Sequence, residues 1–209
     1  MDNNYHSILH VKNEVLLNSF PLDVFVHSVN VANIALSIGS LLTDNKVEQR
    51  KVYDAALYHD IGKSKIPPSI LHKNGKLHHR EWVIMAKHSL YSQELYLNMA
   101  SNDTVNKEIG KVIRHHHENW DGSGYPDNLE GNKIPLYSRI LKIADVFDAI
   151  TQPRCYRPFR MRNAIDVMEL MKGKELDPLL FEKSKGLLKI LLEETYSKDT
   201  CNWMEAINI

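Results

Sequence analysis

Histidine side chains lie on the apolar faces of several expected helices, and this feature limits the possible folds more than any other. The chain of 209 residues contains 11 histidines, which act as metal ligands and proton carriers and are not ordinary core residues. Residues three and four apart share one face of a helix. His27 therefore lies in line with Val24 and Val31, and His88 lies in line with Ile84. The fold must bring these imidazoles inside and supply partners for them.

The hydrophobic periodicity predicts an all-α protein. Apolar residues recur with helical spacing along the chain, whereas convincing strand patterns are scarce. We expect helices over residues 5–17, 21–42, 46–59, 79–99, 103–117, 135–151, 163–171 and 178–194. Segments rich in glycine and proline predict loops at 62–75 and 121–131. The sequence thus favours one helical bundle, with residues 1–20 as a helical extension and residues 21–209 as the domain.

Charge and composition argue against several classes of function. The chain has 26 basic and 26 acidic side chains, so no overall positive field favours extended nucleic acid. No apolar run approaches the ~20 residues that a membrane span requires. The two cysteines, Cys155 and Cys201, and the absence of a basic and apolar leader after Met1 give no sign of export. We therefore expect a cytoplasmic protein that does not enter a membrane.

Carboxylates accompany the inward histidines. His59 and Asp60 follow the apolar positions of the helix expected over residues 46–59. Asp145 lies among apolar residues of another expected helix, and Asp148 follows one turn later. These positions predict acidic groups at the same depth as the imidazoles.

A triple histidine ends the helix expected over residues 103–117. His116 continues the line of Val112, and His117 also faces inward, whereas His115 continues the polar line of Glu108. We interpret the histidines without an apolar context as surface residues, namely His6, His10, His72, His78, His79 and His115.

Each of these side chains taken alone is readily explained as structural, for example as a core histidine bonded to a carbonyl group. Five imidazoles and two carboxylates buried together would carry large desolvation costs unless they shared a ligand. A pair of divalent metal ions satisfies all of them. Mixed imidazole and carboxylate ligands suit iron, manganese or zinc, and the lack of thiolates disfavours a structural zinc site.

Three motifs carry a resemblance to a known family. HDIGK at residues 59–63, HHENWDGSGYP at 116–126 and ADVFDAIT at 144–151 resemble the motifs of HD-GYP domains. HDIGK alone would indicate the broader HD phosphohydrolase superfamily. The HHENWDGSGYP string narrows the resemblance to HD-GYP domains. The resemblance extends over about residues 20–185. It implies a single helical HD-domain bundle with a metal centre in its core. The family binds two or three metals, usually iron or manganese, and hydrolyses cyclic di-GMP to linear pGpG or onward to GMP.

Residue by residue, the resemblance also implies a ligand set. It assigns one metal to His27, His59, Asp60 and Asp145, and the other to His88, His116 and His117, with Asp60 bridging and catalytic. It assigns contacts with the substrate phosphate to Lys63, Arg154 and Arg157, with Lys63 also catalytic. Three residues depart from the family pattern around this set, namely Ser64, Ser92 and Cys155. None of them removes a ligand.

Asp23 stands where three-metal members of the family carry glutamate. An aspartate has a shorter reach, so we expect a weakly held or absent third metal, with Asp148 as a helper. The alternative is that Asp23 orients His27 through its second ring nitrogen.

Other functions stay open at this stage. One is hydrolysis of another cyclic dinucleotide or nucleotide, and another is a non-catalytic module that binds a nucleotide or a protein partner. The glycines of the loop 121–125 fit either a rim that docks a partner or a tight turn anchored by Asp121. The helix expected over residues 5–17 has an apolar face that suits packing on the core or pairing of two subunits into a homodimer.

Overall fold

The structure is a computed structural model that describes residues 22–101, 103–152 and 163–207, with side chains described between residues 24 and 194 of these ranges. The regular elements within these ranges are helices, accompanied by two isolated bridges. The all-α prediction is therefore confirmed. No helix in the described ranges is long and apolar enough to cross a membrane. The extension expected over residues 1–20 lies outside the described residues.

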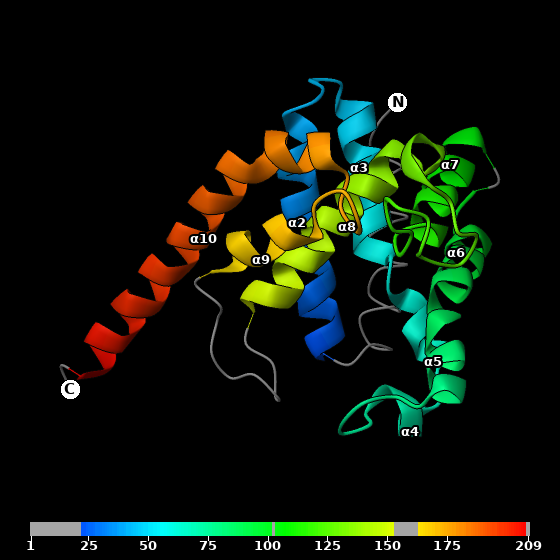
Figure 1. Ribbon diagram of the computed structural model, residues 1–209, viewed down its shortest axis with the longest axis horizontal. Helices are drawn as coiled ribbons and strands as arrows, with labels where there is room; N and C mark the ends of the chain where they lie inside the picture. Colours follow the sequence, from blue (N-terminus) through cyan, green and yellow to red (C-terminus); the bar gives the residue numbers. More distant parts are fainter. Residues whose placement is uncertain (1–21, 102, 153–162, 208–209) are drawn as a thin grey trace.

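The helices are labelled in Figure 1. They are α2 (Leu22–Ser40), α3 (Lys46–Tyr58), α4 (Pro68–Leu71), α5 (His79–Ala86), α6 (His88–Met99), α7 (Thr104–Arg114), α8 (Leu136–Thr151), α9 (Ala164–Met171) and α10 (Pro178–Ile207). Two 3-10 helices, η1 (Ile61–Lys65) and η2 (Gly131–Lys133), lie in the connections.

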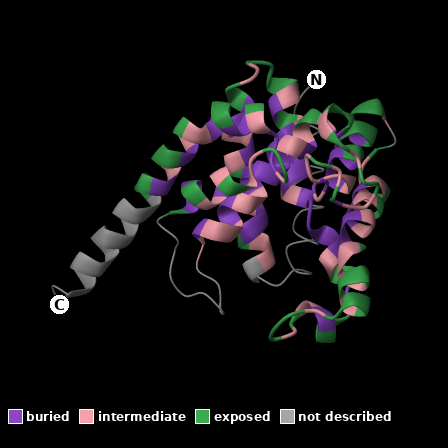
Figure 2. Ribbon diagram, in the orientation of Figure 1, coloured by how far each residue is buried: buried purple, intermediate pink, exposed green. Residues whose placement is uncertain are grey.

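The core lies between α2, α3 and α8, which pack against one another. Ala35 on α2 and Ala55 on α3 are fully buried, and such small side chains let two helices approach closely. Ile140 and Leu141 of α8 are also fully buried, and burial of each such side chain contributes about 1.5–3 kcal/mol. The first half of α10 packs on α8 and α9 and buries Phe181. Figure 2 shows the buried residues concentrated where these helices meet.

A second group of helices, η1, α6 and α7, lies beside α3. Helix α6 packs against both η1 and α7, and α7 packs against α3. A Cβ atom on Gly62 would lie 2.2 Å from the carbonyl oxygen of His88, so this approach of η1 to α6 requires glycine. The Gly62 N–H donates to the hydroxyl of Ser92 at 2.8 Å. Ser92, a departure from the family pattern, therefore joins the two elements.

Two of the expected helices are interrupted or end earlier than the sequence predicts. The helix expected over residues 79–99 is divided into α5 and α6, and the one expected over 103–117 ends with α7. At each end a histidine ring N–H donates to the carbonyl three residues before it; the pairs are His88 with Met85 and His116 with Ile113. In a continuing α-helix that carbonyl accepts the backbone N–H of the residue after the histidine. Helix α10, in contrast, continues beyond its expected end at residue 194.

Candidate metal centre

Three helices end at the same place, and a histidine follows each end. His59 directly follows α3, whereas one residue separates His88 from the end of α5 and His116 from the end of α7. In each ring the Nδ1–H donates to a backbone carbonyl; the acceptors are Ala56 at 2.7 Å, Met85 at 2.7 Å and Ile113 at 2.6 Å. With the proton held on Nδ1, the Nε2 lone pair of each imidazole is free to bind a metal. The three imidazoles are 0–2% exposed.

His27 enters the centre from α2, opposite two aspartates of α8. Its Nδ1 lies 2.6 Å from an Asp148 oxygen and its Nε2 lies 3.1 Å from an Asp145 oxygen. Burial alone would lower the pKa of His27, but the hydrogen bonds to Asp145 and Asp148 raise it to about 9. Burial likewise works to raise the pKa of Asp145, yet the bond from His27 holds it well below its usual range. Metal binding at His27 therefore has to displace a proton.

Asp60 lies between the two groups of imidazoles. One carboxylate oxygen lies 3.3 Å from Nε2 of His59 and 3.7 Å from Nε2 of His27, and the other lies 3.4 Å from Nε2 of His88. Lys63 reaches the same carboxylate, with its Nζ 2.5 Å from an oxygen. Despite burial, neighbouring His59 and Lys63 keep the pKa of Asp60 well below its usual range. A carboxylate in this place can contact two metal ions at once.

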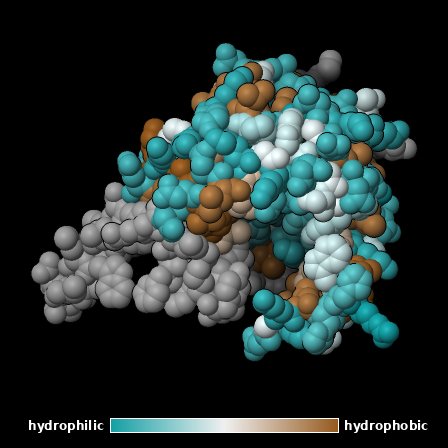
Figure 3. Space-filling view, viewed as in Figure 1, coloured by the Kyte–Doolittle hydropathy of each residue, from teal (hydrophilic) through white to brown (hydrophobic). Residues whose placement is uncertain are grey.

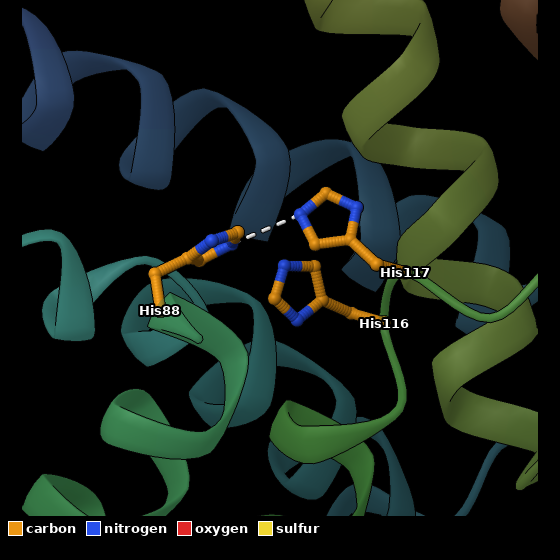
Figure 4. A group of neighbouring side chains, drawn as sticks. All are labelled: His88, His116 and His117. Carbon is orange, nitrogen blue, oxygen red and sulfur yellow. Dashed lines mark hydrogen bonds between the residues drawn. The ribbon is translucent and has the colours of Figure 1, made fainter. Parts of the chain in front are cut away.

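Figure 4 shows the second group, in which His88, His116 and His117 point toward one another. Nε2 of His117 lies 3.0 Å from Nε2 of His88, and the ring centres of His116 and His117 are 4.0 Å apart. Burial and the neighbouring imidazoles lower the pKa of His116 and of His117 well below the usual value. These rings are therefore neutral at pH 7, as metal binding requires.

The residues present fit divalent metal ions. Nε2 of His59, Nε2 of His116 and one oxygen of Asp60 are buried without a hydrogen-bond partner among the described residues. Each of three overlapping groups, His88–His116–His117, His27–His59–Asp145 and His59–Asp60–His116, has its ligand atoms within 4.8 Å of one another. Orphaned nitrogen and oxygen donors at this spacing suit a transition metal. All seven residues that the sequence places in the metal set are thus brought together.

The other predicted site residues have different outcomes. Lys63 is at the centre, a quarter exposed and bonded to Asp60. Arg154, Arg157 and Cys155 lie outside the described residues, as does the side chain of Asp23. Asp148 bonds Nδ1 of His27, the contact that our alternative interpretation gave to Asp23. The weakly held or absent third metal stays a prediction. Ser64 is exposed on η1, where a polar side chain is tolerated.

The loop after α7 is fixed by side chains from its own motif. Buried Glu118 accepts the backbone N–H of Asp127 at 2.7 Å and that of Leu129 at 3.1 Å. Arg114 forms a paired contact with the Asp127 carboxylate at 2.7 and 2.8 Å. His115 also contacts Asp127, at 2.9 Å, and its side chain is 11% exposed, so it is more buried than our assignment as a surface residue predicts. Its partner lies 12 residues away along the chain, and helical phase gives no signal for such a contact.

The glycine loop forms the tight turn that one interpretation predicts, and the docking of a partner on it stays a prediction. Asp121 accepts the backbone N–H of Ser123 at 2.9 Å, which closes a tight turn. A Cβ atom on Gly124 would lie 2.2 Å from the backbone nitrogen of Asn119, so only glycine fits there. The turn delivers the ring of Tyr125 onto that of His117, with centres 4.8 Å apart and planes 26° apart. The loop therefore forms one wall of the metal centre.

Sequence reasoning missed Lys142, one turn before Asp145 on α8. Its side chain is 9% exposed. Burial lowers the pKa of Lys142, and the charge of Asp145 opposes that shift. A lysine on an otherwise apolar helix face, in phase with Asp145, is the signal that could have found it.

Comparison with known proteins identifies the family of this chain. The family model described as HD domain matches residues 11–180. The chain belongs to the HD domain family. Its motifs are those of the HD-GYP members of that family, as the resemblance implied.

Several proteins of the family are similar to this chain. A Vibrio cholerae protein named 3'3'-cGAMP-specific phosphodiesterase 2 is 44% identical over 138 residues, which cover 65% of this chain and 26% of that protein. A Xanthomonas campestris protein named cyclic di-GMP phosphodiesterase response regulator is 38% identical, with 71% and 39% covered. The chain thus spans less than half the length of these curated relatives. A solved HDG"Y"P protein of Bdellovibrio bacteriovorus shares the fold, with a TM-score of 0.63, 17% identity, and coverage of 81% of this chain and 52% of that one.

Proposed function

We propose that this HD domain is a metal-dependent phosphodiesterase that hydrolyses cyclic di-GMP to linear pGpG, GMP or both. The observation that carries the proposal is the set of seven imidazole and carboxylate ligands, five of them buried, arranged as two groups that share Asp60. Relatives named as cyclic di-GMP phosphodiesterases, from Vibrio cholerae and Xanthomonas campestris, support the choice of substrate.

The ligand set supports two divalent ions, with iron or manganese as the metal. In the proposal His27, His59, Asp60 and Asp145 hold one ion, and His88, His116 and His117 hold the other together with Asp60. Nitrogen and oxygen donors without thiolate favour these metals. Asp148 bonds the Nδ1 of His27, which supports an orienting role for Asp148 and a centre of two metals.

The protein's own groups then have separate tasks. A pair of bound ions supplies an activated water and neutralises charge on the phosphoryl oxygens. The ammonium of Lys63 is partly exposed and lies beside Asp60, so it is placed to donate to a phosphoryl oxygen next to the metals. The carbonyl groups bonded to His59, His88 and His116 hold these rings in one orientation, so no reorganisation is needed during the reaction. Arg154 and Arg157 remain proposed contacts with the substrate.

A second substrate has specific support. The relative that is 44% identical is named as specific for 3'3'-cGAMP. Both cyclic dinucleotides join two purine nucleosides through phosphodiesters, so one metal centre suits either. The choice between them depends on groups that contact the bases, outside the ligand set.

The test is turnover by the full chain. Protein purified without oxygen and loaded with iron or manganese would be given cyclic di-GMP and 3'3'-cGAMP separately, and the products identified by mass spectrometry. We expect metal-dependent release of a linear dinucleotide or mononucleotides from cyclic di-GMP. Faster hydrolysis of 3'3'-cGAMP would favour the second substrate. No turnover of either by protein with full metal content would overturn the proposal and favour a binding module.

A further inference from the structure

Helix α5 carries an exposed tryptophan beside the metal centre. None of the residues of α5 is buried, and the side chain of Trp82 is 47% exposed. Because α5 contributes no buried side chain to the core, packing of the core gives no reason for a tryptophan there. Figure 3 shows that much of one face of the molecule is hydrophilic, with apolar side chains in separate small patches. The indole of Trp82 therefore offers an open aromatic face to a ligand.

Ring contacts connect Trp82 to the metal centre. The ring centre of Trp82 lies 5.5 Å from that of Tyr125, in an edge-to-face arrangement. Tyr125 in turn stacks on His117 at 4.8 Å. The indole is thus at most about 10 Å from the ring of a proposed metal ligand. This distance is comparable to the span of one nucleotide, from a phosphate held beside the imidazole to its base.

The charge around α5 suits an anionic ligand. The segment 72–87, which contains α5, has four basic side chains, from Lys73, Lys76, Arg80 and Lys87. Its one acidic residue, Glu81, is already paired with Lys73 at 2.6 Å. The chain as a whole has a formal net charge of zero, so this positive segment is a local feature. It attracts a phosphodiester toward the exposed indole.

We propose that Trp82 stacks on one purine base of the bound cyclic dinucleotide. This inference rests on the proposed function and adds to it a residue that contacts the substrate at a base. The phosphate lies at the metal centre, and the ribose crosses the wall formed by Tyr125. Stacking on the indole face accepts any purine, so Trp82 provides affinity for guanine and adenine alike.

The test compares Trp82→Ala and Trp82→Phe with the neighbouring variant Val83→Ala. Val83 lies on the same helix, is 42% exposed and offers no aromatic ring. Removal of one base–aromatic stack should raise KM for cyclic di-GMP roughly 5- to 150-fold. Trp82→Phe should recover part of the loss, and Val83→Ala should stay close to the parent protein. Metal content should stay unchanged in all three variants, which would show that the metal centre itself is intact.

The outcomes separate this inference from the proposed function. If the parent protein hydrolyses cyclic di-GMP and Trp82→Ala has the same KM, stacking is wrong and the phosphodiesterase stands. An equal rise in KM for Val83→Ala would also overturn stacking, because the effect would belong to the helix. If the metal-loaded parent gives no turnover, calorimetric binding of cyclic di-GMP decides. Weaker binding by Trp82→Ala would support the stack, and equal binding or none would overturn it.

Discussion

We call the seven candidate ligands the floor of the metal centre, and the loop 118–129 together with His115 and Trp82 its wall. The two are held in place in different ways. On the floor, His59, His88 and His116 each bond a carbonyl three residues earlier, in the helix that has just ended. On the wall, Tyr125 is positioned by a loop that Glu118 and other side chains fix through contacts 9 to 13 residues apart. These three histidines are buried, whereas the wall reaches the surface at the half-exposed side chain of Trp82.

This difference separates the two tasks of the site. Ligands on the floor need orientations fixed before a metal arrives, and a short bond within one helical turn supplies them. The wall contacts substrate, so its residues need exposure. Substitutions on the floor should therefore change metal content, and substitutions on the wall should change KM with the metals retained. The five predictions that follow test this division.

The largest effect is expected from Asp60→Asn on the floor. The amide carries no charge and loses the carboxylate that faces both groups of imidazoles, so each ion loses a ligand. Metal affinity should fall by more than the ~10–100-fold that loss of an outer-shell partner costs, and turnover should disappear with it. Metal analysis after dialysis, together with the cyclic di-GMP assay, measures both. Full metal content in the variant would show that Asp60 does not bridge.

Lys63→Ala tests the boundary between floor and wall. Lys63 contacts Asp60 but is partly exposed, and we place its ammonium on the phosphoryl group. Removal of one such donor should lower kcat by about 10²–10³-fold while the metals stay bound. Lys63→Arg, which keeps a charged donor, is the matched control. Loss of metal in Lys63→Ala would make the lysine part of the floor and would contradict its catalytic role.

Asp148→Asn addresses His27, whose Nδ1 is held by a side chain of another helix and not by a backbone carbonyl. Asp148 bonds His27 at 2.6 Å across the interface of α2 and α8. The amide can still accept a hydrogen bond but supplies no charge, so metal affinity should fall ~10–100-fold, with kcat largely recovered at saturating metal. A titration of metal binding measures this loss. A fall in the number of metals bound, at unchanged affinity, would instead indicate that Asp148 is a ligand.

The sequence predicted the floor better than the wall, for a physical reason. His27, His59 and Asp145 lie within helices or directly after one, so helical phase alone indicates which way they face. His116 and His117 also face inward, although the helix that was expected to carry them ends at Arg114. The bond of His116 to Ile113 orients the first ring, and contacts with His88 and Tyr125 orient the second, so helical phase does not set either orientation.

The residues of the wall depend on contacts between distant parts of the chain. Trp82 meets Tyr125 across 43 positions of sequence, and His115 meets Asp127 across a loop. No periodicity in the sequence encodes such pairs. The family motif marks the loop as important, but only the structure shows that Tyr125 stacks on His117.

The metal-free protein should show a stability that depends on the floor histidines. His88, His116 and His117 have lowered pKa values because they are buried, so their contribution is complete above the unfolded value of 6.5 and is lost as pH falls below it. His27 has a pKa raised to about 9, so its contribution is complete below 6.5 and is lost as pH rises through 9.

Melting of chelator-treated protein between pH 5 and 9.5 tests this balance. Stability should be greatest near pH 6.5. It should fall more steeply on the acid side, where three buried histidines take up protons, than on the alkaline side, where His27 alone loses one. Each proton involved gives a slope of up to about 1.4 kcal/mol per pH unit. Added manganese should flatten the profile above pH 6.5. A melting temperature that rises toward pH 5 would contradict the neutral state of the buried rings.

The smallest effect is expected from His115→Ala on the wall. His115 contacts Asp127 at 2.9 Å, but Arg114 holds the same carboxylate with two further bonds. Loss of one partly exposed hydrogen bond costs about 0.5–1.5 kcal/mol, which corresponds to a lower melting temperature by a few degrees in a chain of this size. Metal content should not change, and KM should rise only slightly. Asp127→Ala, which removes both contacts, should cost more by the same measures. If His115→Ala lost metal as Asp60→Asn does, the wall would be part of the ligand set, and the division between floor and wall would fail.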